Sequence, residues 1–127
     1  MHGDCSAALP GPVIWDTEPT WEPLLDVVGP DLTDTFMWMH QQWLPGDTLV
    51  HAYKHRETRR YLYLAEGRRA FVRVRCGALV PLRLDFALER ALSTWWMLGD
   101  FDRKTARAVQ EVITNADTSA YDEGFPD

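Results

Sequence analysis

Apolar and polar residues alternate with a period of two through the middle of the chain, the pattern of strands with one buried face. The alternation recurs in five short runs, at residues 34–44, 48–55, 59–65, 69–75 and 78–84. The segments between the runs are polar or contain Pro45, Gly46, Gly67 or Gly77, whose backbone angles suit tight turns. The spacing predicts an antiparallel β-meander of about five strands over residues 34–84.

Helical patterns precede and follow this predicted sheet. Thr20 is a suitable N-cap and Pro23 is tolerated in a first turn, so a short helix is expected from there to Gly29-Pro30, a pair that ends helices. After the sheet the apolar period lengthens to about 3.6, which predicts two helices, over residues 85–98 and 100–116. Strands followed by helices are typical of the α+β class, so we expect the short N-terminal helix and the two C-terminal helices to pack on one face of the sheet.

The 127 residues are enough for one domain and too few for two separate cores. Residues 1–19 are rich in proline and are expected to form an irregular arm, part of which Val13, Ile14 and Trp15 pin to the body. Residues 20–116 form the single α+β domain, and residues 117–127 are expected to be an acidic, flexible tail.

The net charge of −6 is unevenly distributed along the chain. Residues 1–53 carry a formal charge of −8, residues 54–83 carry +7, and residues 84–127 carry −5. A basic middle between acidic ends indicates either an anionic partner or ends that fold back over the basic segment.

The apolar runs are too short to cross a membrane, and the N-terminus lacks the pattern of a signal peptide. Cys5 and Cys76 are too few for a disulfide framework and are expected to be reduced thiols. We therefore expect a cytoplasmic protein without a membrane partner. The excess of arginine over lysine is typical of a GC-rich bacterial genome.

One face of the predicted sheet carries the candidate binding residues. If Leu62 and Leu64 point toward the helices, alternation places a basic and aromatic set on the opposite face. That set is Arg59, Tyr61, Tyr63, Arg69, Phe71, Arg73, Arg75 and Arg83. The second run places His51, Tyr53 and His55 on a common face, which we expect to match this set.

Such a surface has three interpretations. Tyrosine and arginine are enriched in protein interfaces, so the first is a protein partner, either another protein or a second copy in a homodimer. The second is single-stranded nucleic acid, with aromatic rings stacking on bases and arginines neutralising phosphates. In the third, the acidic ends of the chain cover the face and it has no partner.

The first interpretation predicts a non-enzymatic accessory or regulatory binding protein. The residues expected to carry the binding are Tyr53, Arg59, Tyr61, Tyr63, Arg73 and Arg75. The alternative is a small nucleic-acid-binding protein or a metal-independent ribonuclease that uses the same face. In that case Tyr53-Lys54-His55 with Arg59, Arg60 and Tyr61 would transfer protons and stabilise phosphate charge.

We expect no catalytic residue, no metal and no cofactor. The sequence has no nucleophile elbow, no phosphate-binding loop and no cysteine pair with zinc spacing. A two-residue loop at Pro45-Gly46 would place His40 opposite His51, close enough for two metal ligands, whereas a three-residue loop would separate them.

Overall fold

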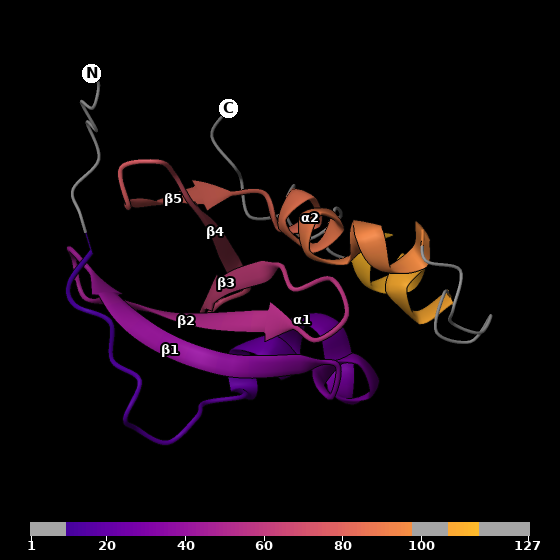
Figure 1. The fold of residues 1–127 in the computed structure, drawn as a ribbon, viewed down its shortest axis with the longest axis horizontal. Helices are drawn as coiled ribbons and strands as arrows, with labels where there is room; N and C mark the ends of the chain where they lie inside the picture. Colours follow the sequence, from indigo (N-terminus) through magenta and orange to yellow (C-terminus); the bar gives the residue numbers. More distant parts are fainter. Residues whose placement is uncertain (1–9, 98–106, 115–127) are drawn as a thin grey trace.

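The computed structural model describes residues 10–97 and 107–114, with side chains omitted at 93–97. Five antiparallel strands form one sheet in the order β1-β2-β3-β4-β5, so each strand lies beside its neighbours in the sequence (Figure 1). The strands are β1 (Phe36–Leu44), β2 (Thr48–His55), β3 (Tyr61–Ala65), β4 (Arg69–Arg73) and β5 (Leu79–Leu82). The predicted meander and the α+β class are confirmed.

The N-terminal helix α1 (Glu22–Thr33) is longer than predicted. Its N-cap is Trp21, without a side-chain hydrogen bond, so the expected capping by Thr20 is wrong. Gly29 interrupts the helix with φ 82° and ψ 168°, and Pro30 then begins a final turn. The Gly29-Pro30 pair therefore kinks the helix where the sequence predicted its end, because proline is tolerated at the start of the new turn.

Two helices follow the sheet, as predicted. Helix α2 (Leu84–Met97) begins one residue before Asp85, which lies in its first turn. The Arg83 guanidinium donates to both carboxylate oxygens of Asp85, at 3.1 and 3.0 Å, so the two residues fix the start of the helix. Residues 107–114 are helical, whereas the beginning and end predicted for this second helix, around residues 100 and 116, lie outside the described residues.

All three helices pack on one face of the sheet, and the main core lies between the layers. It buries Leu24, Leu32, Phe36, Tyr53, Leu62, Leu64, Ala70, Leu88, Leu92 and Val109 among others. Because each strand alternates its side chains, Leu62 and Leu64 point to this covered face as predicted. Burying such side chains contributes about 1.5–3 kcal/mol each, and the core is the main source of stability.

The opposite face is curved and has a small core of its own. Val50, Ala65, Phe71 and Leu79 are buried together there, one from each of β2, β3, β4 and β5. Figure 1 shows the hairpin of β4 and β5 rising out of the plane of the first three strands. The sheet is therefore curled, and the face without helices is its concave side.

Both edges of the sheet are protected against pairing with another strand. Along β1, Ile14 exchanges two backbone hydrogen bonds with Gln41, at 2.8 and 2.9 Å, and the Gly11 N–H donates to the Trp43 carbonyl at 2.8 Å. At the other edge, β5 is four residues long and contains Pro81, which has no N–H to donate. Short edges and proline discourage edge-to-edge association.

The state of the cysteines and the length of the helices bear on the predicted location of the protein in the cell. Cys76 forms a disulfide, so the prediction of a reduced thiol is wrong there and the thiol argument for a cytoplasmic protein no longer holds. Cys5 lies outside the described residues. No helix within residues 10–97 and 107–114 combines the length and apolar character needed to cross a membrane.

His55 organises the turn between β2 and β3. Its ring is fully buried against Phe36, and its Nδ1 accepts the backbone N–H groups of Glu57 and Thr58, both at 3.2 Å. Burial lowers the pKa of His55 from 6.5 to about 4. Protonation of Nδ1 would also remove the acceptor for both N–H groups.

We expect His55 to make the protein acid-sensitive. Between pH 6.5 and 4 the unfolded chain binds a proton at His55 that the folded chain excludes, so the free energy of unfolding falls as the pH falls. Wild type should be more stable than His55→Gln at pH 7, and this advantage should shrink by about 2–3 kcal/mol by pH 4.5. Urea unfolding of both proteins at several pH values measures the difference, and a difference independent of pH would contradict it.

Candidate functional site

Tyr53 lies on the covered face of the sheet. The register pairs Tyr53 with Leu62 and His51 with Leu64, so both side chains point toward the helices. Tyr53 is fully buried, its ring lies 5.9 Å from that of Trp21, and its hydroxyl donates to the Thr20 carbonyl at 2.6 Å. Burial raises its pKa. The expectation that Tyr53 belongs to the open binding face is therefore wrong, and its role is to anchor the chain before α1.

The turn after β2 explains this error. The His55 N–H donates to the Arg60 carbonyl and the Arg59 N–H donates to the His55 carbonyl, both at 2.9 Å, so residues 56–59 form the turn. The pairing that follows places the odd-numbered residues of β2 beside the even-numbered residues of β3. His51, Tyr53 and His55 therefore share the face of Leu62 and Leu64.

The same register separates the residues suggested for a ribonuclease. His55 and Tyr53 are buried on the helix side, whereas Lys54 lies on the concave side, its Nζ 5.8 Å from the centre of the Tyr61 ring. Arg59 stands in the turn with φ 65° and is exposed. The Tyr53-Lys54-His55 segment and Tyr61 therefore do not form one catalytic cluster.

His40 and His51 are not opposite each other. The loop after β1 has three residues, because Leu44 pairs with Thr48, and this register continues without interruption to His40. A bulge follows between His40 and Trp38. His40 consequently pairs with Ala52. Within the described part of the chain, no group of three His, Cys, Asp or Glu side chains is arranged to hold a metal ion.

Two tyrosines and two cations meet on the concave face. The rings of Tyr61 and Tyr63 are stacked, with centres 5.7 Å apart and planes 16° apart. Lys54 lies over the first ring, and the Arg73 guanidinium lies 5.3 Å from the centre of the second. Tyr61 is 37% exposed, so this aromatic pair is accessible from solvent.

The Arg73 side chain stabilises the fold and also forms part of the concave surface. Its guanidinium donates to the Tyr63 hydroxyl at 3.3 Å, to the Gly77 carbonyl at 2.8 Å and to the side-chain oxygen of Gln42. The Gln42 amide in turn donates to the Gly11 carbonyl at 2.9 Å. Arg73 on β4 thus reaches β1 across the concave face and holds the sheet in its curled form.

Arg59 and Arg75 lie outside this cluster. Both are exposed in turns, Arg59 before β3 and Arg75 after β4, and neither is part of a strand. Of the six residues predicted to bind, Tyr61, Tyr63 and Arg73 are brought together, whereas Tyr53 is buried.

The sheet is split where β3 and β4 separate. Their pairing covers three residue pairs and ends at Tyr63 with Phe71, although β3 begins at Tyr61 and β4 continues to Arg73. Among the described residues, Tyr61 and Arg73 therefore lack the strand pairing that the register would give them. The strands diverge at this point because β4 turns out of the sheet plane with β5.

A cleft of about 470 Å³ opens at this split, between β3, β4, β5 and α2. Its walls are formed by Arg60, Tyr61, Leu62, Tyr63, Phe71, Val72, Arg73, Leu82, Ala87 and Arg90. Three of the ten are arginines and none is acidic. The apolar members form a floor that continues the main core, and the volume is in the range of ligand sites.

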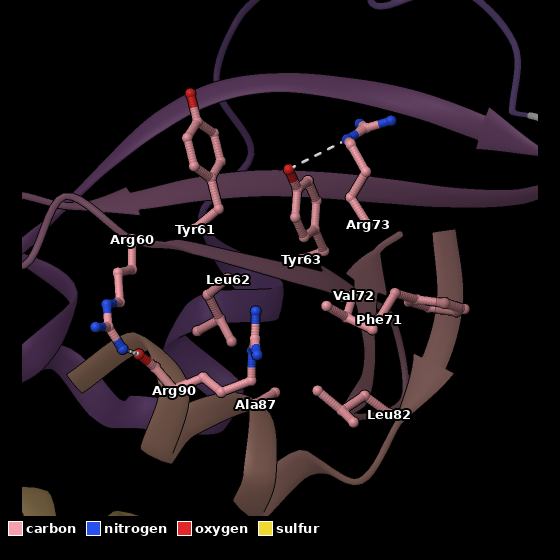
Figure 2. A pocket seen from close by; sticks show the side chains of 10 residues that line it. All are labelled: Arg60, Tyr61, Leu62, Tyr63, Phe71, Val72, Arg73, Leu82, Ala87 and Arg90. Atoms are coloured by element: carbon pink, nitrogen blue, oxygen red, sulfur yellow. Dashed lines mark hydrogen bonds between the residues drawn. The ribbon is translucent and has the colours of Figure 1, made fainter. Parts of the chain in front are cut away.

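Arg90 of α2 is the central cation of the cleft. Figure 2 shows its guanidinium pointing from the helix into the space between Leu62 and Val72. The Arg60 side chain approaches from the other wall and donates to the Arg90 carbonyl at 3.1 Å. Both arginines are exposed to solvent, and positive charges gathered at one cleft attract an anion.

Sequence reasoning named Arg60 only for the ribonuclease alternative and missed Arg90. Alternation within the strands concerns one element at a time, whereas Arg90 belongs to helix α2, which lines the cleft through Ala87 and Arg90. The available signal was helical spacing: Ala87 and Arg90 are three residues apart and so share one face of α2.

No known protein family, curated protein or solved structure matches this chain.

Arg73 is expected to be needed for stability. Arg73→Lys keeps the charge but loses the planar fork that reaches three acceptors, so we expect a loss of about 1–3 kcal/mol in the free energy of unfolding. Arg75→Lys makes the same change at an exposed arginine two residues further on; it is the matched control and should change stability by less than about 0.5 kcal/mol. Urea unfolding provides the measurement, and an Arg73→Lys protein as stable as wild type would refute the structural role.

Proposed function

We propose that this protein is a non-enzymatic binding protein, acting as an accessory or regulatory factor, and that its basic cleft and adjacent tyrosines bind an acidic segment of a protein partner. The observation that supports this most directly is the composition of the cleft. Among the ten described residues that line it, three are arginines (Arg60, Arg73 and Arg90) and none is Asp or Glu, in a chain whose net charge is −6. Three arginines around one cleft favour an anionic ligand.

The residue types also suit a protein interface. Arginine and tyrosine are prominent among residues that contribute most to binding energy, particularly when they surround a dehydrated centre. Here the stacked Tyr61 and Tyr63 border the cleft, and the floor is apolar. A partner segment therefore meets charge, aromatic surface and apolar surface within one site.

The apolar floor favours a protein segment over single-stranded nucleic acid. Leu62, Val72 and Leu82 offer contacts to an aliphatic chain, which a polypeptide has and a sugar-phosphate backbone lacks. Tyr61 and Tyr63 stack on each other, so they form one aromatic platform and not two separate base-stacking positions.

A second copy of the chain remains one form of the proposed partner. Because both sheet edges are blocked, it would bind through acidic residues in the cleft and not by strand pairing at an edge. The oligomeric state, measured by sedimentation for wild type and cleft variants, identifies this case.

We expect Arg90→Ala to weaken binding of labelled poly-L-glutamate about 10-fold, because a charge-assisted contact contributes roughly 1.5–3 kcal/mol. Arg56→Ala removes the same charge from an exposed turn outside the cleft and is the matched control. Fluorescence anisotropy at low and moderate salt gives the affinities, with circular dichroism to check the fold.

Labelled oligouridylate of equal charge tests the nucleic-acid alternative in the same assay. We expect it to bind more weakly than poly-L-glutamate. Equal effects of Arg56→Ala and Arg90→Ala would show that the cleft is not the site, and tighter binding of oligouridylate would favour the nucleic-acid function.

A further inference from the structure

The split between β3 and β4 exposes backbone groups as well as arginines. In an antiparallel pair, residues alternate between directing their N–H and C=O groups to one neighbouring strand and to the other. The His55 N–H donates to the Arg60 carbonyl, so the even-numbered residues of β3 face β2. Tyr61 and Tyr63 consequently direct their backbone groups toward β4.

The same reasoning applies to β4. The Val74 N–H donates to the Ala78 carbonyl at 2.9 Å, so Val74 faces the β5 side. Arg73 and Phe71 therefore face β3. Phe71 finds its partner in Tyr63, but the next pair, Tyr61 with Arg73, is not formed between the described strands. The cleft thus has strand backbone on two sides with N–H and C=O groups directed into it.

From this we infer that the cleft accepts an extended acidic peptide segment whose backbone pairs with Tyr61 or Arg73 and whose inward carboxylate contacts Arg60 and Arg90. The inference rests on the proposed function and specifies its ligand. A peptide in extended conformation presents N–H and C=O groups at the spacing that a strand requires, as in other cases of strand addition.

The side-chain chemistry of the cleft suits a glutamate in the inward position. Leu62, Val72 and Ala87 form an apolar wall against which the two methylene groups can pack. The Arg90 guanidinium lies at the middle of this wall (Figure 2). The carboxylate of an inward glutamate would contact it there. A glutamate therefore places its apolar stem and its charge against matching groups of the protein.

The outward side chains of the same segment face the tyrosines. Successive residues of an extended peptide point to opposite sides, so the neighbours of an inward glutamate point toward Tyr61 and Tyr63 on the concave face. An apolar residue at these positions would cover the stacked rings. The ligand class is therefore an extended segment in which acidic and apolar residues alternate.

The probe that tests this is a labelled, end-capped hexapeptide of alternating glutamate and valine, compared with the same peptide carrying N-methyl groups at its valines. N-methylation keeps the charge but removes hydrogen-bond donors. Both are titrated into the full chain by fluorescence anisotropy, with a lysine–valine hexapeptide as the charge control.

We expect saturable binding of the glutamate–valine peptide, a loss of at least about fivefold on N-methylation, corresponding to one or two hydrogen bonds, and no binding of the lysine–valine peptide. Arg90→Ala should weaken binding about 10-fold, since a charge-assisted contact is lost. NMR shifts on binding should be largest at the Tyr61 and Arg73 amides. The peptide modifications leave the protein unchanged, so protein misfolding does not affect this comparison.

Failure of this inference is distinguishable from failure of the proposed function. Equal affinity for the methylated and unmethylated peptides, with a clear effect of Arg90→Ala, would overturn backbone pairing and leave an electrostatic site. Absence of hexapeptide binding, while poly-L-glutamate binds through Arg90, would overturn the extended ligand alone. If neither ligand depends on Arg90, both proposals are wrong.

Discussion

The early end of the pairing between β3 and β4 is the constraint on which the rest of the structure depends. After three residue pairs β4 leaves the plane of the sheet, and β5 follows it. The departure is stabilised from the concave side by the small core around Phe71 and Leu79 and by the contacts of Arg73 with Gln42 and Gly77. A flat sheet would have closed the split and placed α2 over a continuous surface.

In the curled sheet, Arg73 and Arg90 have different roles. Arg73 donates to three acceptors within the fold, which fixes its position and limits what it can offer a ligand. Arg90 enters the cleft from a helix, with its guanidinium in the open space between strands (Figure 2). The basic segment, residues 54–83, therefore mainly stabilises the fold and forms the border of the cleft. The central positive charge of the cleft, Arg90, lies outside that segment.

Alternation in the sequence was sufficient to predict the strands, their order and the face that receives Leu62 and Leu64, since burial of one sheet face requires a period of two. Alternation alone did not predict which face of the sheet each side chain of β2 would occupy. Whether Tyr53 points to the helices depends on the number of turn residues between His55 and Arg60, and a change of one residue reverses every side chain. In the same way, the length of the loop at Pro45-Gly46 determined whether His40 lies opposite His51.

The candidate site was predictable where it follows from strand alternation, at Tyr61, Tyr63, Phe71 and Arg73. The split that creates the cleft is a tertiary effect of the curled sheet, and no local pattern at residues 69–73 indicates where pairing will stop. Arg90 approaches through the packing of α2 on the sheet, which depends on the whole core. The excess of arginine in residues 54–83 is independent of register, and it predicted either an anionic partner or acidic ends folded over the basic segment.

Backbone hydrogen exchange of the free protein tests most directly whether β3 and β4 are open beyond their three paired residues. The Tyr63 and Phe71 amides belong to a formed pair and should exchange slowly, whereas the Tyr61 and Arg73 amides, directed into the cleft, should exchange far faster although they lie in the same strands. Equal protection of all four amides would show that the strands are paired to their ends, and the cleft would then not exist.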